Sequence, residues 1–274
     1  MPRKTNNVPT VALAAALALG APAVHATSVS STILSDFRIT LVDLAPGDGI
    51  AASIALDPLS RSTALAGAVS PGANSFWMNQ GNSVFDPVSV SGILGGEGTG
   101  GAASFAGDPF GAGATLATSA VAQPSFAEGV GEAYIDTQPS GFNTITVGAH
   151  TQVSFSGLAS LVWNASVPGA AAYGDVSMSF MQDAPGGPVV VDQDEFAAGW
   201  VPSGGSTLAG AASDTVSIAF MNTSDDAVVL DYFINVFAGA SEIDLPSVDE
   251  PGRLALLLAG LMPLLGFAAR RRVG

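Results

Sequence analysis

Cysteine is absent from this chain of 274 residues, so the sequence excludes a disulfide framework, a thiolate metal site and a cysteine nucleophile. Lysine occurs once, at Lys4, and histidine twice, at His25 and His150. Lys4 and His25 lie in an N-terminal segment that we expect to be cleaved off, which leaves His150 as the only histidine. The remaining chain therefore has no lysine for a Schiff base and no pair of histidines for a metal site.

Basic residues are scarce between Asp36 and Glu250. That interval holds all 23 acidic residues of the chain against two arginines, Arg38 and Arg61, so it carries a net charge of −21. Nucleic acid is excluded as a partner because phosphate binding needs a basic surface, and the same holds for anionic lipid headgroups. Solubility through mutual repulsion explains this charge, and Ca²⁺ binding is the alternative.

The N-terminus has the three parts of a secretory signal peptide. Arg3 and Lys4 provide its positive charge, residues 11–20 are apolar, and Val24-His25-Ala26 has the small-x-small pattern of a cleavage site. No twin arginine is present, which favours the general secretion translocon. We expect residues 1–26 to form a signal helix that is cut between Ala26 and Thr27. A short buried helix is the alternative.

The C-terminal segment 247–274 also has three parts in a fixed order. Asp249, Glu250 and Pro251 precede the uncharged run 254–269, which Arg270, Arg271 and Arg272 follow. A helix of these 16 residues is about 24 Å long, against about 30 Å of bilayer hydrocarbon, so it barely spans a membrane. Three adjacent arginines favour the cytoplasmic side, which places the preceding residues outside.

This tail resembles the PEP-CTERM sorting signal, in which a Pro-Glu-Pro motif precedes a short transmembrane helix and an arginine cluster. Glu250 and Pro251 match the last two motif positions, while Asp249 stands where the first proline is expected. The resemblance implies transient anchoring in the inner membrane, cleavage near the motif by exosortase, and delivery to the cell surface or extracellular matrix, in association with exopolysaccharide or biofilm. A plain C-terminal anchor and a helix packed on the domain are the alternatives.

Between the two ends the dominant periodicity is that of β-strands. Residues 36–44, 50–56, 83–91, 142–147, 151–156, 174–181, 214–221 and 227–237 are the segments that we expect to form strands. The last two are separated by turn residues and predict a hairpin. Because no long helical pattern lies between the ends, we expect residues 27–246 to form an all-β domain, an antiparallel β-sandwich of jelly-roll type. The glycine-rich stretch 92–113 predicts a flexible loop or a weakly held edge.

No catalytic motif is evident in this domain. Neither GxSxG nor a phosphate-binding loop occurs, and His150 is either the base of a Ser-His-Asp triad or a plain turn histidine. Two carboxylates are enough for a glycoside hydrolase, but with 23 acids the sequence does not nominate a pair. Asp192, Asp194 and Glu195 are either Ca²⁺ ligands or part of a solvated loop after a strand at 189–191.

The few aromatic residues leave two readings open. Trp77, Trp163 and Trp200, with three tyrosines, either pack in the core or form a platform for stacking sugars, and their apolar neighbours favour the core. Trp200, near Gly199 and Pro202, is the tryptophan that we expect to be most exposed. We therefore expect an exported, non-enzymatic surface or matrix protein without a cofactor. A carbohydrate-binding module and a carboxylate-dependent hydrolase are the alternatives.

Overall fold

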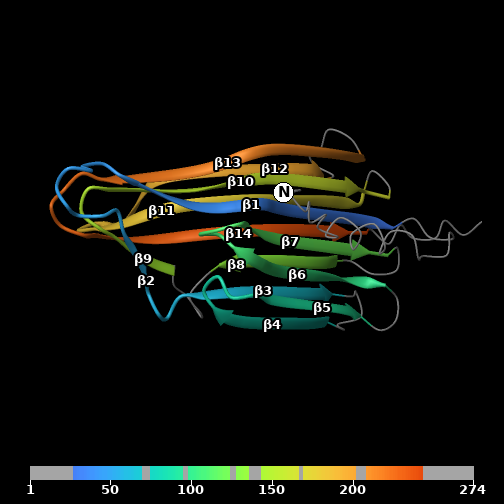
Figure 1. Ribbon diagram of the computed structural model, residues 1–274. Coiled ribbons are helices and arrows are strands. Elements are labelled where there is room, and N and C mark those ends of the chain that lie inside the picture. The colour runs from blue at the N-terminus through green and yellow to red at the C-terminus, as the bar shows by residue number, and fades with distance from the viewer. Residues whose placement is uncertain are drawn as a thin grey trace, which may run out of the picture. The chain divides into compact units, whose positions relative to one another are not determined.

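A computed structural model of the chain describes residues 27–69, 75–94, 98–123, 143–166, 169–201 and 208–242, and residues 128–135 by their backbone. All of them belong to the first of two units, Met1–Ile243 and Asp244–Gly274. Within these ranges every regular element is a β-strand, and the long strands lie nearly parallel to one common axis (Figure 1). The predicted all-β fold is therefore confirmed, while the expected signal helix at 1–26 and transmembrane helix at 254–269 lie outside the described residues.

The strands form two antiparallel sheets. Sheet A has six strands in the order β13-β10-β1-β7-β6-β5. Their bounds are β13 Ala209–Asn222, β10 Thr151–Asn164, β1 Ser28–Asp43, β7 Gly113–Ala122, β6 Thr99–Asp108 and β5 Val88–Leu94. The main path of sheet B is β12-β11-β14-β8-β3-β4, and the short strands β2 and β9 pair beside β14 at one end. Their bounds are β12 Gly187–Trp200, β11 Ala171–Ala184, β14 Val228–Ser241, β8 Glu128–Ile135, β3 Arg61–Val69, β4 Ser75–Ser83, β2 Ile54–Leu56 and β9 Asn143–Val147.

The two sheets share one hydrophobic core, as expected of a β-sandwich. Its centre is a group of aromatic rings from both sheets: Phe155 of β10 lies 5.8 Å from Phe37 of β1, 4.8 Å from Phe180 of β11 and 5.4 Å from Tyr232 of β14, between ring centroids. All four side chains are fully buried. Alternation of buried and exposed residues along these strands, which the sequence predicts, places the rings on the inner face.

Alanine fills the core where the aromatic group ends. Ala120 and Ala122 of β7 form a small buried cluster with Ala238 and Ala240 of β14. Ala64, Ala66 and Ala68 of β3 also face inward and are fully buried. Short side chains let the two sheets approach each other there, which explains how a chain with few large apolar residues still builds a packed interior.

A β-bulge divides β1 into two halves of opposite phase. Before the bulge the even-numbered residues are buried: Ser28, Ser30, Thr32 and Leu34. Beyond the bulge the odd-numbered residues Phe37 and Ile39 are buried instead. The pairing of β1 with both neighbours shifts at this point, and Asp36 has a left-handed backbone with φ of 52°. One extra residue reverses the facing of every later side chain. Arg38 stabilises the bulge by donating from Nε to Oδ1 of Asp36 over 2.8 Å.

The predicted hairpin at 214–221 and 227–237 is wrong, although both strands exist. Residues 214–221 lie in β13, which pairs with β10 in sheet A. Residues 228–237 lie in β14, which pairs with β11, β8 and β9 in sheet B. The turn between them therefore carries the chain from one sheet to the other instead of closing a hairpin.

The prediction of a loop at 92–113 is wrong for residues 99–108. These residues form β6, an interior strand that pairs with β5 on one side and β7 on the other. Glycine suits this position because neighbouring backbone is close: a Cβ at Gly100 would collide with the carbonyl oxygen of Gly92. β6 is thus held by two ladders, whereas residues 92–94 end β5, the edge strand of sheet A.

Candidate functional site

The start and the end of the described chain are joined at one end of the fold. The Ser166 N–H donates to Oγ of Ser28 over 3.0 Å, and the Ser166 hydroxyl donates to Oε2 of Glu242 over 2.6 Å. Ser28 follows Thr27, the predicted first residue after cleavage, and Glu242 precedes the predicted sorting segment. Ala26, the motif at 249–251 and the arginines at 270–272 lie outside the described residues. The start of β1, which follows the first predicted processing site, and the end of β14, which precedes the second, thus lie at the same end of the fold.

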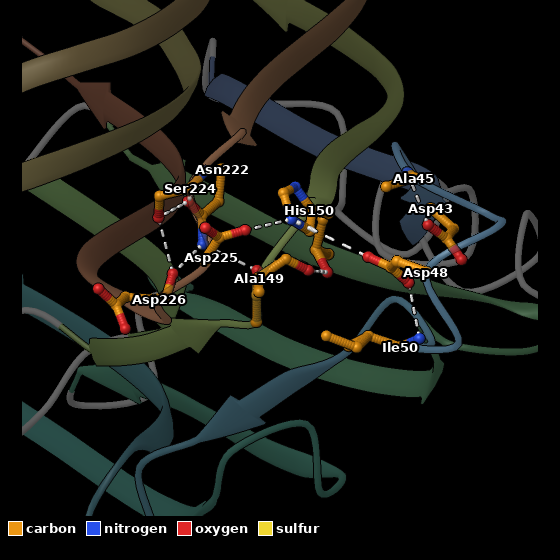
Figure 2. Close-up of polar contacts among 12 residues, drawn as sticks. Asp43, Ala45, Asp48, Ile50, Ala149, His150, Asn222, Ser224, Asp225 and Asp226 are labelled. Carbon is orange, nitrogen blue, oxygen red and sulfur yellow. Dashed lines mark hydrogen bonds and ion pairs between the residues drawn. The ribbon is translucent and has the colours of Figure 1, made fainter.

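The opposite end of β1 carries the only histidine of the described residues. His150 lies in the turn between β9 and β10 with a left-handed φ of 51°. Its Nε2 is 2.9 Å from Oδ1 of Asp225 and 3.9 Å from Oδ2 of Asp48, and its carbonyl accepts from the Leu44 N–H over 2.8 Å. Figure 2 shows the imidazole between two aspartates that come from separate loops. His150 therefore ties three loops together at this end.

Ser224, a serine of these described loops, is not placed as the nucleophile of a triad with His150. The nearby Ser224 hydroxyl is within hydrogen-bonding distance of Oδ1 of Asn222, at 2.7 Å, and of the Asp226 carbonyl, at 2.8 Å, and Figure 2 shows it on the far side of Asn222 from the imidazole. The Asn222 amide donates to the carbonyls of Gly148 and Asp226, both over 2.8 Å. These bonds fix the loops, and they support the reading of His150 as a turn histidine.

The acidic cluster at 192–195 is part of a strand, so the prediction of a solvated loop is wrong. It lies in β12, the edge strand of sheet B. Oδ2 of Asp192 accepts from the Ala219 N–H over 2.7 Å, and Oδ2 of Asp194 accepts from the Ser217 N–H over 2.8 Å. Both donors belong to β13, the edge strand of sheet A. The two carboxylates thus occupy free amides of the opposite edge and close this side of the sandwich.

The hydrogen bonds of Asp192 and Asp194 to β13 compete with the binding of Ca²⁺ by these carboxylates. The carboxylates of Asp192 and Asp194 are directed at N–H donors, which a cation would have to displace. Glu195 lies one position further on the strand, on the outer side. Among the residues that the structure describes, no group of three or more acidic or histidine side chains is placed to hold a metal ion.

Of the three tryptophans, Trp163 and Trp200 pack inside and Trp77 does not. Trp163 is 7% exposed and belongs to a second core cluster, against which Trp200 packs. Trp77 of β4 is 55% exposed. The expectation that Trp200 is the most exposed is therefore wrong. Of the tyrosines, Tyr232 is fully buried, and burial raises the pKa of its phenol.

The outer face of sheet B carries exposed aromatic rings that lie on glycines. A Cβ at Gly67 would overlap the indole of Trp77, and a Cβ at Gly239 would press on the rings of Tyr173 and Phe237. Tyr173 is 39% exposed. Backbone pairing places the glycines and the two exposed aromatics in one row across the sheet: Gly199, Tyr173, Gly239, Val130, Gly67 and Trp77. Sequence reasoning missed this row because glycines and rings come from five separate strands.

An acid with a perturbed pKa lies beside this row. Burial raises the pKa of Asp175, the nearby charge of Glu195 raises it further, and a hydrogen bond from Asn235 opposes both effects. Asp175 follows Tyr173 by two residues on β11 and therefore shares its face of the sheet. Rings, a carboxyl group and the Asn235 amide are thus together on one surface.

Among the described residues there is no helix long and apolar enough to cross a membrane. Comparison with known proteins found no matching family model, no similar curated protein and no similar solved structure.

Proposed function

We propose that this chain is an exported bacterial protein of the cell surface or extracellular matrix, without enzymatic activity or a cofactor. Residues 1–26 direct it to the secretion translocon, and residues 247–274 act as a PEP-CTERM-like sorting signal. The helix 254–269 anchors it transiently in the inner membrane with Arg270, Arg271 and Arg272 inside. Exosortase then cuts near Asp249-Glu250-Pro251, and the released domain associates with exopolysaccharide or biofilm.

The observation that carries this proposal is the joining of Ser28, Ser166 and Glu242 at one end of the fold. β1 has 16 residues, so at about 3.3 Å per residue the His150 loops lie about 50 Å away at its other end. A domain connected at one end to both processed segments has the His150 loops at the end remote from both attachment points. The chain also passes repeatedly between the two sheets, as at β13 and β14, which supports a jelly-roll-like sandwich.

The test is localisation in the natural host. We expect the wild-type chain outside the inner membrane, and a chain that ends after Ser247 to be exported without sorting. Replacing Arg270, Arg271 and Arg272 by alanine should hold the protein at an unprocessed stage, because the orienting charge is lost. Arg253→Ala, which removes an arginine on the other side of the apolar run, is the matched control. A wild-type chain that stays in the cytoplasm with residues 1–26 attached would contradict the proposal.

A carbohydrate-binding module is the second candidate, and the row across sheet B favours it. Trp77 is 55% exposed and Tyr173 is 39% exposed, and aromatic faces stack on sugar rings. Four strand spacings separate Tyr173 and Trp77, which is about 19 Å, so the row suits a glycan chain. With a net charge of −21 over residues 36–250, the ligand class is a neutral polysaccharide.

Retention in gels containing a neutral polysaccharide tests this second role. Trp77→Ala and Tyr173→Ala should each weaken retention, and Val229→Ala, which removes an exposed apolar side chain from β14, should not. Equal retention of all four proteins would exclude the row as the binding surface. A carboxylate-dependent hydrolase would use Asp175 and Glu195. Release of sugar by the wild type, abolished by Asp175→Asn, would identify that activity instead.

A further inference from the structure

The part of the outer face of sheet A that lies before the β1 bulge has no charged side chain across its full width. Pairing aligns six residues, one from each strand, in a row: Ser91, Ala102, Ser119, Ser31, Val162 and Ala211. The next row, which runs through Ile33 and Ser160, adds serines and an alanine and again no charge. The charged groups of this face lie at and beyond the bulge: Arg38 and Asp36 form an ion pair at 2.7 Å, and the exposed Asp108 ends β6.

Exposed aliphatic side chains are distributed over this face. Val162 is 58% exposed and Leu158 is 45% exposed on β10, Ile93 is exposed on β5, and Met221 is exposed on β13. Apart from these, its outward positions are mostly serine, threonine and alanine, whose short side chains let another surface approach the backbone closely. Such a face combines apolar contact area with groups that remain hydrated while it is open.

The outer face of sheet B is different. Asp175, Glu195 and Asp231 lie on it together with its aromatic residues. Two molecules with this acidic composition repel each other through every surface that carries such charges. The uncharged face of sheet A is where that repulsion is weakest.

We infer that the outer face of sheet A docks a second copy of this chain, in a two-fold dimer with the two A sheets back to back. A two-fold interface uses the same patch on both subunits, so an uncharged patch meets an uncharged patch. The acids of sheet B and of the loops then lie outside the contact. This inference does not depend on the sorting signal, since it uses the described strands alone.

The available area is sufficient for a stable dimer. Six strands at spacings of about 4.8 Å make the sheet about 24 Å wide from β5 to β13, and the eight residues of β1 before the bulge extend about 26 Å. The uncharged patch is therefore about 600 Å² on each subunit, which is the lower limit of the area per partner in specific protein interfaces.

Sedimentation equilibrium tests the dimer on protein purified from its host in the form that the cells make. The wild type should sediment at twice the chain mass, and the dissociation constant should fall as salt is added, because salt screens the repulsion between the acidic subunits. Ser160→Glu places like charges in the contact and should raise the dissociation constant at least about 100-fold. Ser179→Glu adds the same charge to the outer face of sheet B and should change it less than about threefold.

Ser213→Glu, an exposed position paired with Ser160, repeats the test where a change in folding is least expected. Circular dichroism of each variant establishes that it is folded. A wild type that is monomeric at every concentration would overturn the inference. Equal dissociation constants for Ser179→Glu and the two sheet A variants would also overturn it, because the contact would then lie elsewhere.

Discussion

Removing the carboxylates that join β12 to β13 should destabilise the sandwich and expose a strand edge. The double variant Asp192→Ala, Asp194→Ala leaves the Ala219 and Ser217 amides without their acceptors, which now lie at 2.7 and 2.8 Å. Both amides belong to the free edge of a strand of 14 residues. A long open edge is a template for pairing with another chain.

The expected loss of stability is modest. Hydrogen bonds to charged groups contribute about 1.5–3 kcal/mol, and exposure to solvent lowers this to about 0.5–1 kcal/mol for each bond. The double variant should therefore lose about 1–2 kcal/mol of unfolding free energy. For a domain of this size that loss lowers Tm by about 2–8 °C.

Hydrogen exchange and thermal unfolding measure the two effects separately. We expect the amides of Ser217 and Ala219 to exchange faster in the double variant, and the protein to aggregate sooner at neutral pH. Asp214→Ala is the matched control, because Asp214 also lies on β13 but its Oδ1 accepts from the adjacent Thr215 N–H. If both amides keep their protection, or if the double variant is no less stable than the control, then these carboxylates do not close the edge.

Three further predictions concern Asp175, Asp36 and the candidate Ca²⁺ ligands. Asp175→Asn should stabilise the protein at neutral pH and lose this effect as the pH falls below about 4, because folding raises the pKa of Asp175 above its unfolded value of 3.8 and the ionised carboxylate therefore opposes folding. Urea unfolding at a series of pH values measures this, and a pH-independent effect would contradict it. Asp36→Gly should be tolerated while Asp36→Val costs about 1–2 kcal/mol, since φ is 52° there; equal stabilities by chemical denaturation would refute the strain. Calcium should raise Tm no more in the wild type than in the Asp192, Asp194 double variant, as calorimetry would show, and a rise confined to the wild type would establish a Ca²⁺ site.

Strand positions in the second half of the chain could be predicted from the sequence because their signal is local. Val176, Met178 and Phe180 alternate with polar residues and are buried in the structure, as are Leu230, Tyr232, Ile234 and Val236. Alternation of this kind identifies a strand and its inner face, whatever its partners are.

Pairing could not be predicted because it depends on distant segments. A polar turn of five residues precedes β14, and nothing in its sequence distinguishes a hairpin from a crossing between sheets. The Asn222 amide fixes the crossing by donating to Gly148, which is distant in sequence. Likewise, the glycines at 92–113 suggest a flexible loop when only their neighbours in sequence are considered, whereas the ladders of β5 and β7 hold Gly100, Gly101 and Gly107 in β6.

The candidate surfaces were hidden for the same reason. Asp192 and Asp194 look like a solvated loop until β13 is placed opposite them. Trp77 has apolar neighbours, but Phe76 and Met78 turn inward to cover Gly92, so the indole lies on the outer face. The two terminal signals are predicted from contiguous residues, and they stay predictions because both lie outside the described residues.

The central claim is that the finished protein is the acidic β domain between two removable ends. Intact mass and terminal peptides of the native protein, from wild-type host cells and from cells without exosortase, test it most directly. The account predicts a wild-type molecule that begins at Thr27 and ends near Glu250-Pro251, and a longer form in the mutant cells. A mature molecule that keeps residues 254–272 in wild-type cells would contradict it.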